Sequence, residues 1–428
     1  MTVTASPPDH AVKAPPGSGW REVYTLAGMR SLSVFGDIMA ATALTLLAQK
    51  NGAGGFAVMA LLMAATLPPV FLAPITGGIA DRFDSRKIIV IVASLQALTC
   101  VAMMTTTSIP VLVALCTLLA VGVSFTHPVF GGLPSAMVGK DDIPRASAIS
   151  QTTTMAGMLF APAVAGLLSS RSGTTLPLAL NAASFVLVVL GALTISTRLH
   201  KKTTAAPQAA AAEPSPEPAA APYRVWSDGF LRSVLVLSGI VMACACIINV
   251  LIVFYVRDTF GASEQVYGVI MTTWAAGMVP GALLARRVKN LSHEAILIGS
   301  FVCIGVAILG VGLAPGVWWI APFYFLGGVG NGAQATVTHI VFNLRVPHSH
   351  RGRAFAALGA VSNTGPGTGF LLGGLLLTVI EPRYGFLAAG ALIAVSLLVM
   401  ARKVLQSSDT APAATPAPVP AVKAQPAD

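Results

Sequence analysis

Long apolar runs alternate with short polar segments along most of the chain. The runs lie near residues 26–48, 56–79, 88–108, 111–133, 146–169, 175–196, 230–256, 265–285, 293–313, 317–340, 353–379 and 384–401. Each run is close in length to the ~20 apolar residues with which one helix crosses a bilayer. This pattern predicts an all-α membrane protein with twelve transmembrane helices.

A low-complexity segment, TTAAPQAAAAEPSPEPAAAP at residues 203–222, divides these runs six and six. It is rich in Ala, Pro and Glu and cannot bury a core. We therefore expect a disordered leader, a six-helix bundle, a cytoplasmic linker, a second six-helix bundle and a disordered tail. The corresponding ranges are 1–25, 26–196, 197–229, 230–401 and 402–428.

The composition fits a chain whose solvent is lipid. Hydrophobic residues make up 55% of it and charged residues 10%, with a mean hydropathy of +0.77, whereas a soluble domain carries about 25% charged residues. The net charge of +10 is spread among the loops, so we expect lipid contact and no nucleic-acid partner. All five cysteines lie inside apolar runs, which predicts neither a disulfide framework nor a metal site.

The distribution of Lys and Arg predicts the orientation. Four loops on one side carry eleven of these residues, and six loops on the other side carry four. Positive residues mark the cytoplasmic side. Both termini and the linker share the richer side, so we expect them to be cytoplasmic in a multi-pass protein of a bacterial-type inner or plasma membrane.

The two groups of six apolar runs share sequence patterns at corresponding positions. The fifth run opens with Arg145-Ala-Ser-Ala, and Gly166-Leu-Leu follows 21 residues later. The eleventh opens with Arg353-Ala-Phe-Ala, and Gly374-Leu-Leu again follows 21 residues later. Two parallel repeats with a site between them are a transporter architecture.

A charged loop, GGIADRFDSRK at residues 77–87, separates the second and third runs. It resembles the signature loop of the major facilitator superfamily, roughly G-x-L-A-D-R-x-G-R-R-K. The matching residues are Gly77, Ala80, Asp81, Arg82, Arg86 and Lys87, while Ile79, Asp84 and Ser85 depart from the pattern. The more local resemblance is to the drug- and siderophore-exporter branch.

This resemblance implies a gate on the cytoplasmic side. Glycine permits close helix approach, and an aspartate can accept hydrogen bonds from a helix N-terminus, here that of the eleventh helix. The expected gate residues are Gly77, Asp81, Arg82, Arg86, Arg351 and Arg353. The alternative is that these charges only fix the topology.

Asp37 is the one acidic residue of sixteen that lies near the middle of an apolar run. An ionised side chain there costs on the order of 2.5–3.5 kcal/mol, which makes it a functional candidate. We expect Asp37 to carry a coupling proton or to contact substrate, with a structural hydrogen bond as the alternative. Arg30 lies two turns earlier on the same face, ~10 Å along the axis. We place it near the cytoplasmic interface as a second candidate, with packing as its alternative.

The fifth run reads GMLFAPAVAG from Gly157 to Gly166. It resembles the superfamily's antiporter motif, G-x-x-x-G-P-x-x-G-G, with Ala161 and Ala165 in two glycine positions. In the family this motif accompanies proton-driven export. Pro162 removes a backbone donor, so we expect a kink.

Other polar side chains are scarce in the runs. The candidates for lining a cavity are His127, Asn249, Asn331, Gln334 and His339. Hydrogen bonding between helices is the alternative for each of them. Because so little charge lies in the runs, we expect an amphipathic or apolar solute.

These observations predict a monomeric transporter that exports a small amphipathic or hydrophobic compound (a drug, siderophore or secondary metabolite) in exchange for protons. An uptake symporter of the same fold and a membrane sensor without flux are the alternatives. The chain contains no H-E-x-x-H and no G-x-x-x-x-G-K-[ST]. It offers one intramembrane carboxylate where aspartyl catalysis needs two. We therefore expect neither an enzyme nor a cofactor.

Overall fold

A computed structural model describes residues 18–197, 226, 228–288, 291–347 and 350–408. Residues 1–17 of the expected disordered leader, most of the linker and residues 409–428 of the tail lie outside these ranges, whereas residues 18–25 and 402–408 are helical. The described residues form twelve α-helices. Their bounds are α1 Ser18–Lys50, α2 Gly54–Arg82, α3 Ser85–Met104, α4 Ile109–Met137, α5 Ile143–Ser172, α6 Thr175–Thr194, α7 Gly229–Phe254, α8 Glu264–Arg287, α9 His293–Gly312, α10 Val317–Arg345, α11 Arg351–Leu376 and α12 Pro382–Ser408.

The predicted all-helical fold is confirmed, with one helix for each apolar run. Ten of the described helices are long and apolar enough to cross a membrane. Helices α10 and α11 are the other two, because glycine and polar residues replace much of their aliphatic content. Glycine in α10 lets a neighbouring helix approach closely. A Cβ at Gly332 would lie 2.1 Å from the carbonyl oxygen of Met278 in α8, so a larger residue would prevent this contact.

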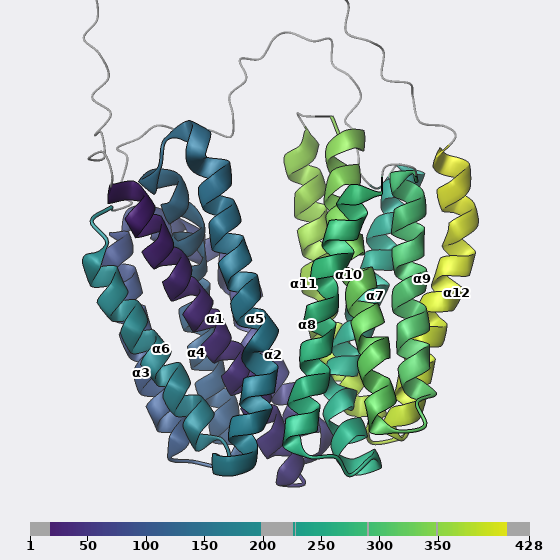
Figure 1. Ribbon diagram of the computed structural model, residues 1–428, viewed down its shortest axis with the longest axis horizontal. Coiled ribbons are helices and arrows are strands. Elements are labelled where there is room, and N and C mark those ends of the chain that lie inside the picture. Colours follow the sequence, from purple (N-terminus) through teal and green to yellow (C-terminus); the bar gives the residue numbers. More distant parts are fainter. Residues whose placement is uncertain (1–17, 198–225, 227, 289–290, 348–349, 409–428) are drawn as a thin grey trace, which may run out of the picture.

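The helices gather into two bundles, α1–α6 and α7–α12 (Figure 1). The same pairs pack in each: α1 on α5 as α7 on α11, α2 on α4 as α8 on α10, and α3 on α6 as α9 on α12. This correspondence agrees with the repeat seen in the sequence. Each bundle therefore has the same internal plan.

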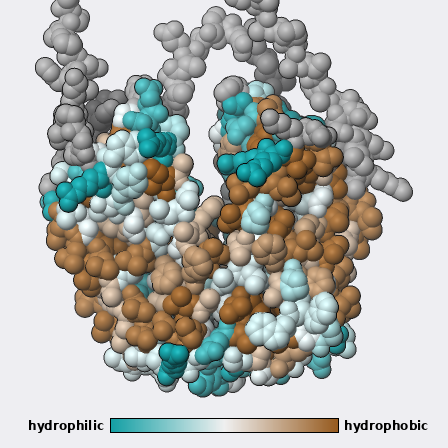
Figure 2. All heavy atoms as spheres, in the orientation of Figure 1, coloured by the Kyte–Doolittle hydropathy of each residue, from teal (hydrophilic) through white to brown (hydrophobic). Residues whose placement is uncertain are grey.

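The bundles meet near one end and diverge toward the other. The odd-numbered helices begin at the diverging end, which we name the open end, and a cleft separates the bundles there in the space-filling view (Figure 2). We name the opposite end the closed end. On the face shown in Figure 2, hydrophobic side chains cover much of the middle of each bundle, and hydrophilic ones gather toward the ends. This surface suits a lipid environment.

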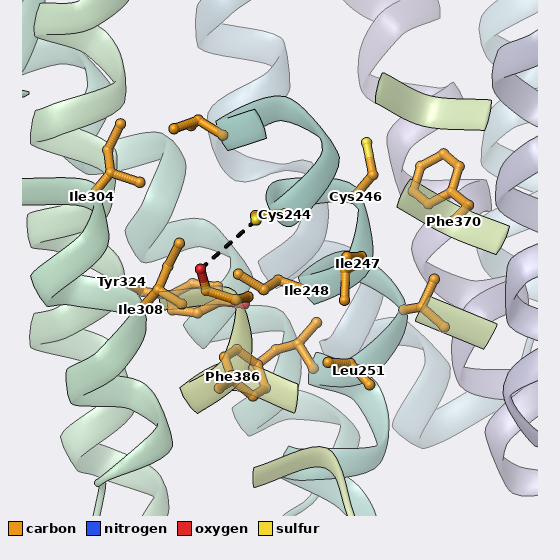
Figure 3. Close-up of a cluster of buried hydrophobic side chains, with 14 of the residues drawn as sticks. Cys244, Cys246, Ile247, Ile248, Leu251, Ile304, Ile308, Tyr324, Phe370 and Phe386 are labelled. Carbon is orange, nitrogen blue, oxygen red and sulfur yellow. Dashed lines mark hydrogen bonds between the residues drawn. The ribbon is translucent and has the colours of Figure 1, made fainter. Parts of the chain in front are cut away.

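Helix α7 lies at the centre of a core in the second bundle. Its residues Ile248 and Leu251 pack near Phe386 of α12 (Figure 3), and these side chains are buried. Cys244 donates a hydrogen bond from Sγ to the carbonyl oxygen of Ala389 at 3.8 Å. All five cysteines are free, and four of them are buried, so they act as small core residues.

Candidate functional site

The closest approach between the bundles is a crossing of α5 and α8. A Cβ at Gly166 would lie 2.4 Å from the carbonyl oxygen of Glu264, and one at Gly268 would lie 2.4 Å from that of Pro162. The hydroxyl of Thr272 accepts a hydrogen bond from the backbone N–H of Ala163 at 3.1 Å. Backbone therefore touches backbone here, which only glycine allows.

The antiporter-like motif is divided between two contacts. Pro162 and Gly166 face α8 of the other bundle. Gly157 instead faces α1 of its own bundle, where a Cβ would lie 2.7 Å from the carbonyl oxygen of Ser31. The structure therefore brings one half of the motif to the boundary between the bundles.

A polar clasp joins the bundles at the closed end. The side-chain amide of Gln49, at the end of α1, donates to Asp258 at 2.6 Å and accepts from Arg257 at 3.3 Å. Both partners lie in a short π-helix, η3 Tyr255–Thr259, that extends α7. Arg257 also donates to the carbonyl oxygen of Ala262. The sequence gives no signal for this clasp, because a π-helical turn has no simple residue pattern.

Asp37 lies on a cavity inside the first bundle. The cavity has a volume of about 180 Å³, and its walls come from α1, α2, α3 and α4. Apart from Asp37 and Thr45, its lining is apolar, with the residues Ala40, Ala41, Leu44, Leu61, Leu62, Ala65, Met103, Cys116, Leu119, Ala120 and Val123. Asp37 thus places a single carboxyl group beside a mainly hydrophobic space.

Asn181 of α6 holds this carboxyl group in place. The side-chain amide of Asn181 donates a hydrogen bond to Asp37 at 3.4 Å. The hydroxyl of Ser184 donates to the side-chain oxygen of Asn181 at 3.2 Å. Gly36 makes room, since a Cβ there would lie 2.2 Å from Oδ1 of Asn181. The Gly36-Asp37 pair therefore brings α6 close enough for this bond. The sequence analysis missed Asn181, which is fully buried and lies 144 residues away.

Arg30 lies deeper in α1 than its distance from the apolar run suggested. Helix α1 begins at Ser18 and not near residue 26, so Arg30 is 12 residues, or ~18 Å, inside the helix. Residues before the run hold the additional turns in place: Trp20 stacks on Arg145, and Glu22 accepts hydrogen bonds from the backbone of Ser196 and Thr197.

The polar candidates of the second bundle have separate surroundings. Gln334 donates to Ser238 of α7 at 3.2 Å and to Thr338 at 3.3 Å. His339 stacks on Phe355 of α11 with ring centroids 5.6 Å apart. Asn331 is half-buried and Asn249 is exposed. The contacts of Gln334 and His339 are therefore between helices of one bundle.

The charged loop lies at the open end. Arg86 donates to the carbonyl oxygen of Leu193 in α6 at 2.7 Å, and Asp84 caps α3 through the N–H of Arg86 at 2.8 Å. Arg82 is exposed, and a Cβ at Gly77 would meet no atom within 4 Å. Asp81 is the penultimate residue of α2, and its side chain lies outside the described part of the chain.

The other expected gate residues lie at the start of α11, also at the open end. Arg351 donates to the carbonyl oxygen of Asn343 at 2.6 Å, and Arg353 is exposed. Within the described residues, no three His, Cys, Asp or Glu side chains come together in a way that could hold a metal ion. The site is thus one of helix packing, the half-buried acid Asp37 and several exposed or half-buried arginines.

Comparison with known proteins agrees with this geometry. Residues 23–426 match the family described as transmembrane secretion effector. The MFS-type transporter YfiS of Bacillus subtilis (strain 168) is 26% identical over 392 residues, which cover 87% of this chain and 90% of that protein. The enterobactin exporter EntS of Shigella flexneri is 26% identical, and the alignment covers 63% of this chain and 64% of that protein.

A solved structure supports the fold independently. A POT family transporter in complex with 5-aminolevulinic acid superposes with a TM-score of 0.73 at 11% identity, covering 92% of this chain and 98% of that one. The family match extends over nearly the whole chain. The protein is therefore a secondary transporter of the major facilitator superfamily, not an enzyme, and it belongs to the transmembrane secretion effector family.

Proposed function

We propose that the protein exports a small amphipathic compound in exchange for protons, by alternating access. The observation that carries this proposal is the position of Asp37. It is the one acid near the middle of a described helix, it borders the mainly apolar cavity, and its described hydrogen-bond donor is a neutral amide. A carboxyl group in that place can bind and release a proton as access to the cavity alternates.

The direction of transport rests on two further observations. The positive loops lie at the open end, so the positive-inside rule assigns that end to the cytoplasm. The cleft would then receive solute from inside the cell. The relatives of Shigella flexneri and Escherichia coli that align with this chain are named as exporters.

The charged loop would then latch the open end when the cleft shuts. Arg82 is exposed at the open end of α2 and Arg353 at the open end of α11, and the two helices pack on each other across the boundary between the bundles. Arginine binds helix-end carbonyls and carboxylates well. We assign the latch to Gly77, Asp81, Arg82, Arg86, Arg351 and Arg353. An Asp81→Ala variant with unchanged transport and an unchanged balance of conformations would contradict this assignment.

Transport in liposomes tests the role of Asp37. Purified protein is reconstituted, a proton gradient is imposed, and the movement of a panel of amphipathic compounds is followed. Asp37→Asn should transport at the same rate with and without the gradient, because the amide cannot carry a proton. Asp141→Asn, an exposed acid at the open end, is the matched control and should keep the response to the gradient.

Undiminished coupling in Asp37→Asn would remove Asp37 as the proton carrier. Faster accumulation in right-side-out than in everted vesicles would favour the uptake symporter. A protein that binds compounds but moves none of them would favour the sensor.

A further inference from the structure

Within the described part of the chain, Arg30 is a cation without an anionic partner. It lies two turns from Asp37 on the same face of α1, but the carboxyl group of Asp37 receives its hydrogen bond from Asn181. Among the described residues, Arg30 has neither an ion pair nor a hydrogen bond through its guanidinium group. An arginine within a candidate membrane-spanning helix is expected to face water or a ligand and not lipid.

His127 of α4 lies on a helix that packs against α1. The two helices touch at the open end, where a Cβ at Gly19 of α1 would meet the carbonyl oxygen of Met137 at the end of α4. The depths of the two side chains agree: Arg30 is ~18 Å from the open end of α1, and His127 is 10 residues, or ~15 Å, from the open end of α4. His127 is exposed and Arg30 is half-buried, so both are accessible.

Both residues continue the walls of the cavity. On α4, the lining residues Cys116, Ala120 and Val123 share a helix face with His127. On α1, the lining residues Asp37 and Ala41 share a face with Arg30. Arg30 and His127 are nearer the open end than these residues. They therefore lie between the cavity and the open end of the first bundle.

We infer that Arg30 and His127 bind the anionic group of an amphipathic substrate whose apolar body enters the cavity beside Asp37. The guanidinium group can hold a carboxylate, or another planar anion, through two parallel hydrogen bonds, and the imidazole can donate one more. This inference rests on the proposed transport function and narrows its substrate class. It also narrows the expectation of an amphipathic or apolar solute to an amphipathic anion.

Matched aromatic probes test the substrate class. Benzoate, 2-naphthoate and anthracene-2-carboxylate are compared with the amide and the aminomethyl analogue of each ring, so that charge alone changes within a set. Binding to the purified full-length protein is measured by equilibrium dialysis in lipid nanodiscs. We expect at least one carboxylate to bind about tenfold or more tightly than its amide and its amine.

Three variants assign the site. Arg30→Gln should weaken carboxylate binding by about 10- to 100-fold, and His127→Gln by a smaller factor. Arg30→Lys keeps the charge but loses the paired hydrogen bonds, so it should bind more tightly than Arg30→Gln and more weakly than the wild type. Arg171→Gln removes an exposed arginine at the closed end and should bind as the wild type does. Thermal unfolding of each variant checks that it folds.

Several outcomes would overturn the inference: no carboxylate binds, an amide or amine binds equally well, or folded Arg30→Gln binds normally. The assay contains no membrane gradient, so it does not depend on export. Selective carboxylate binding without proton-driven flux would contradict the proposed function alone. Flux of neutral or cationic compounds without carboxylate binding would contradict this inference alone.

Discussion

At the scale of single residues, Gly36 controls how closely α6 approaches Asp37. A Cβ there would lie 2.2 Å from Oδ1 of Asn181 and 2.9 Å from the hydroxyl of Ser184, and both neighbours are buried. Gly36→Ala should lower the free energy of unfolding by about 1–3 kcal/mol, because these side chains have little room to move. Gly28→Ala on the same helix meets no atom within 4 Å and is the control, with a neutral or slightly stabilising effect. Thermal unfolding in detergent compares them, and equal midpoints would contradict the packing argument.

At the scale of helices, the crossing of α5 and α8 holds the closed end together. Gly268→Ala places a methyl group against the backbone of Pro162, and an overpacked contact costs about 1–3 kcal/mol. The ratio of molecules closed at this end to molecules open there should fall by a factor of about 5 to 150. Spin labels on Thr107→Cys and Glu381→Cys, which lie in loops of different bundles at the closed end, should show a longer distance. Gly131→Ala, in open space on α4, should leave that distance unchanged.

At the scale of the whole molecule, alternating access requires the clasp at Gln49 to open in every cycle. A short bifunctional thiol reagent that joins Gln49→Cys to Asp258→Cys should stop transport, because the positions lie in different bundles. We expect at least about a tenfold fall in rate relative to either single variant treated alike. Transport at the normal rate after complete cross-linking would show that the closed end need not separate.

The sequence predicted most of the architecture but few of its contacts. The lengths of the apolar runs alone predict the twelve helices. They do not predict that α1 begins eight residues before its apolar run, because the hydrogen bonds of Glu22 that hold these turns go to residues more than 170 positions away. Asp37 stands out in the sequence because a charge inside an apolar run is rare. Its partner Asn181 and the clasp at Gln49 do not, since both depend on how distant helices rotate against each other.

The position of Gly166 along α5 makes the first bundle an unequal lever. Gly166 lies 6 residues from the closed end of α5 and 23 from its open end, which gives arms of ~9 Å and ~35 Å. A tilt of about 10° around this fulcrum would sweep the long arm by ~6 Å and the short arm by less than ~2 Å. A small rotation is therefore enough to close the cleft at the open end. The same rotation moves the closed end too little to separate Gln49 from Asp258, so that step calls for an additional local rearrangement. The π-helical turn at Tyr255–Thr259 is the irregular element next to this contact.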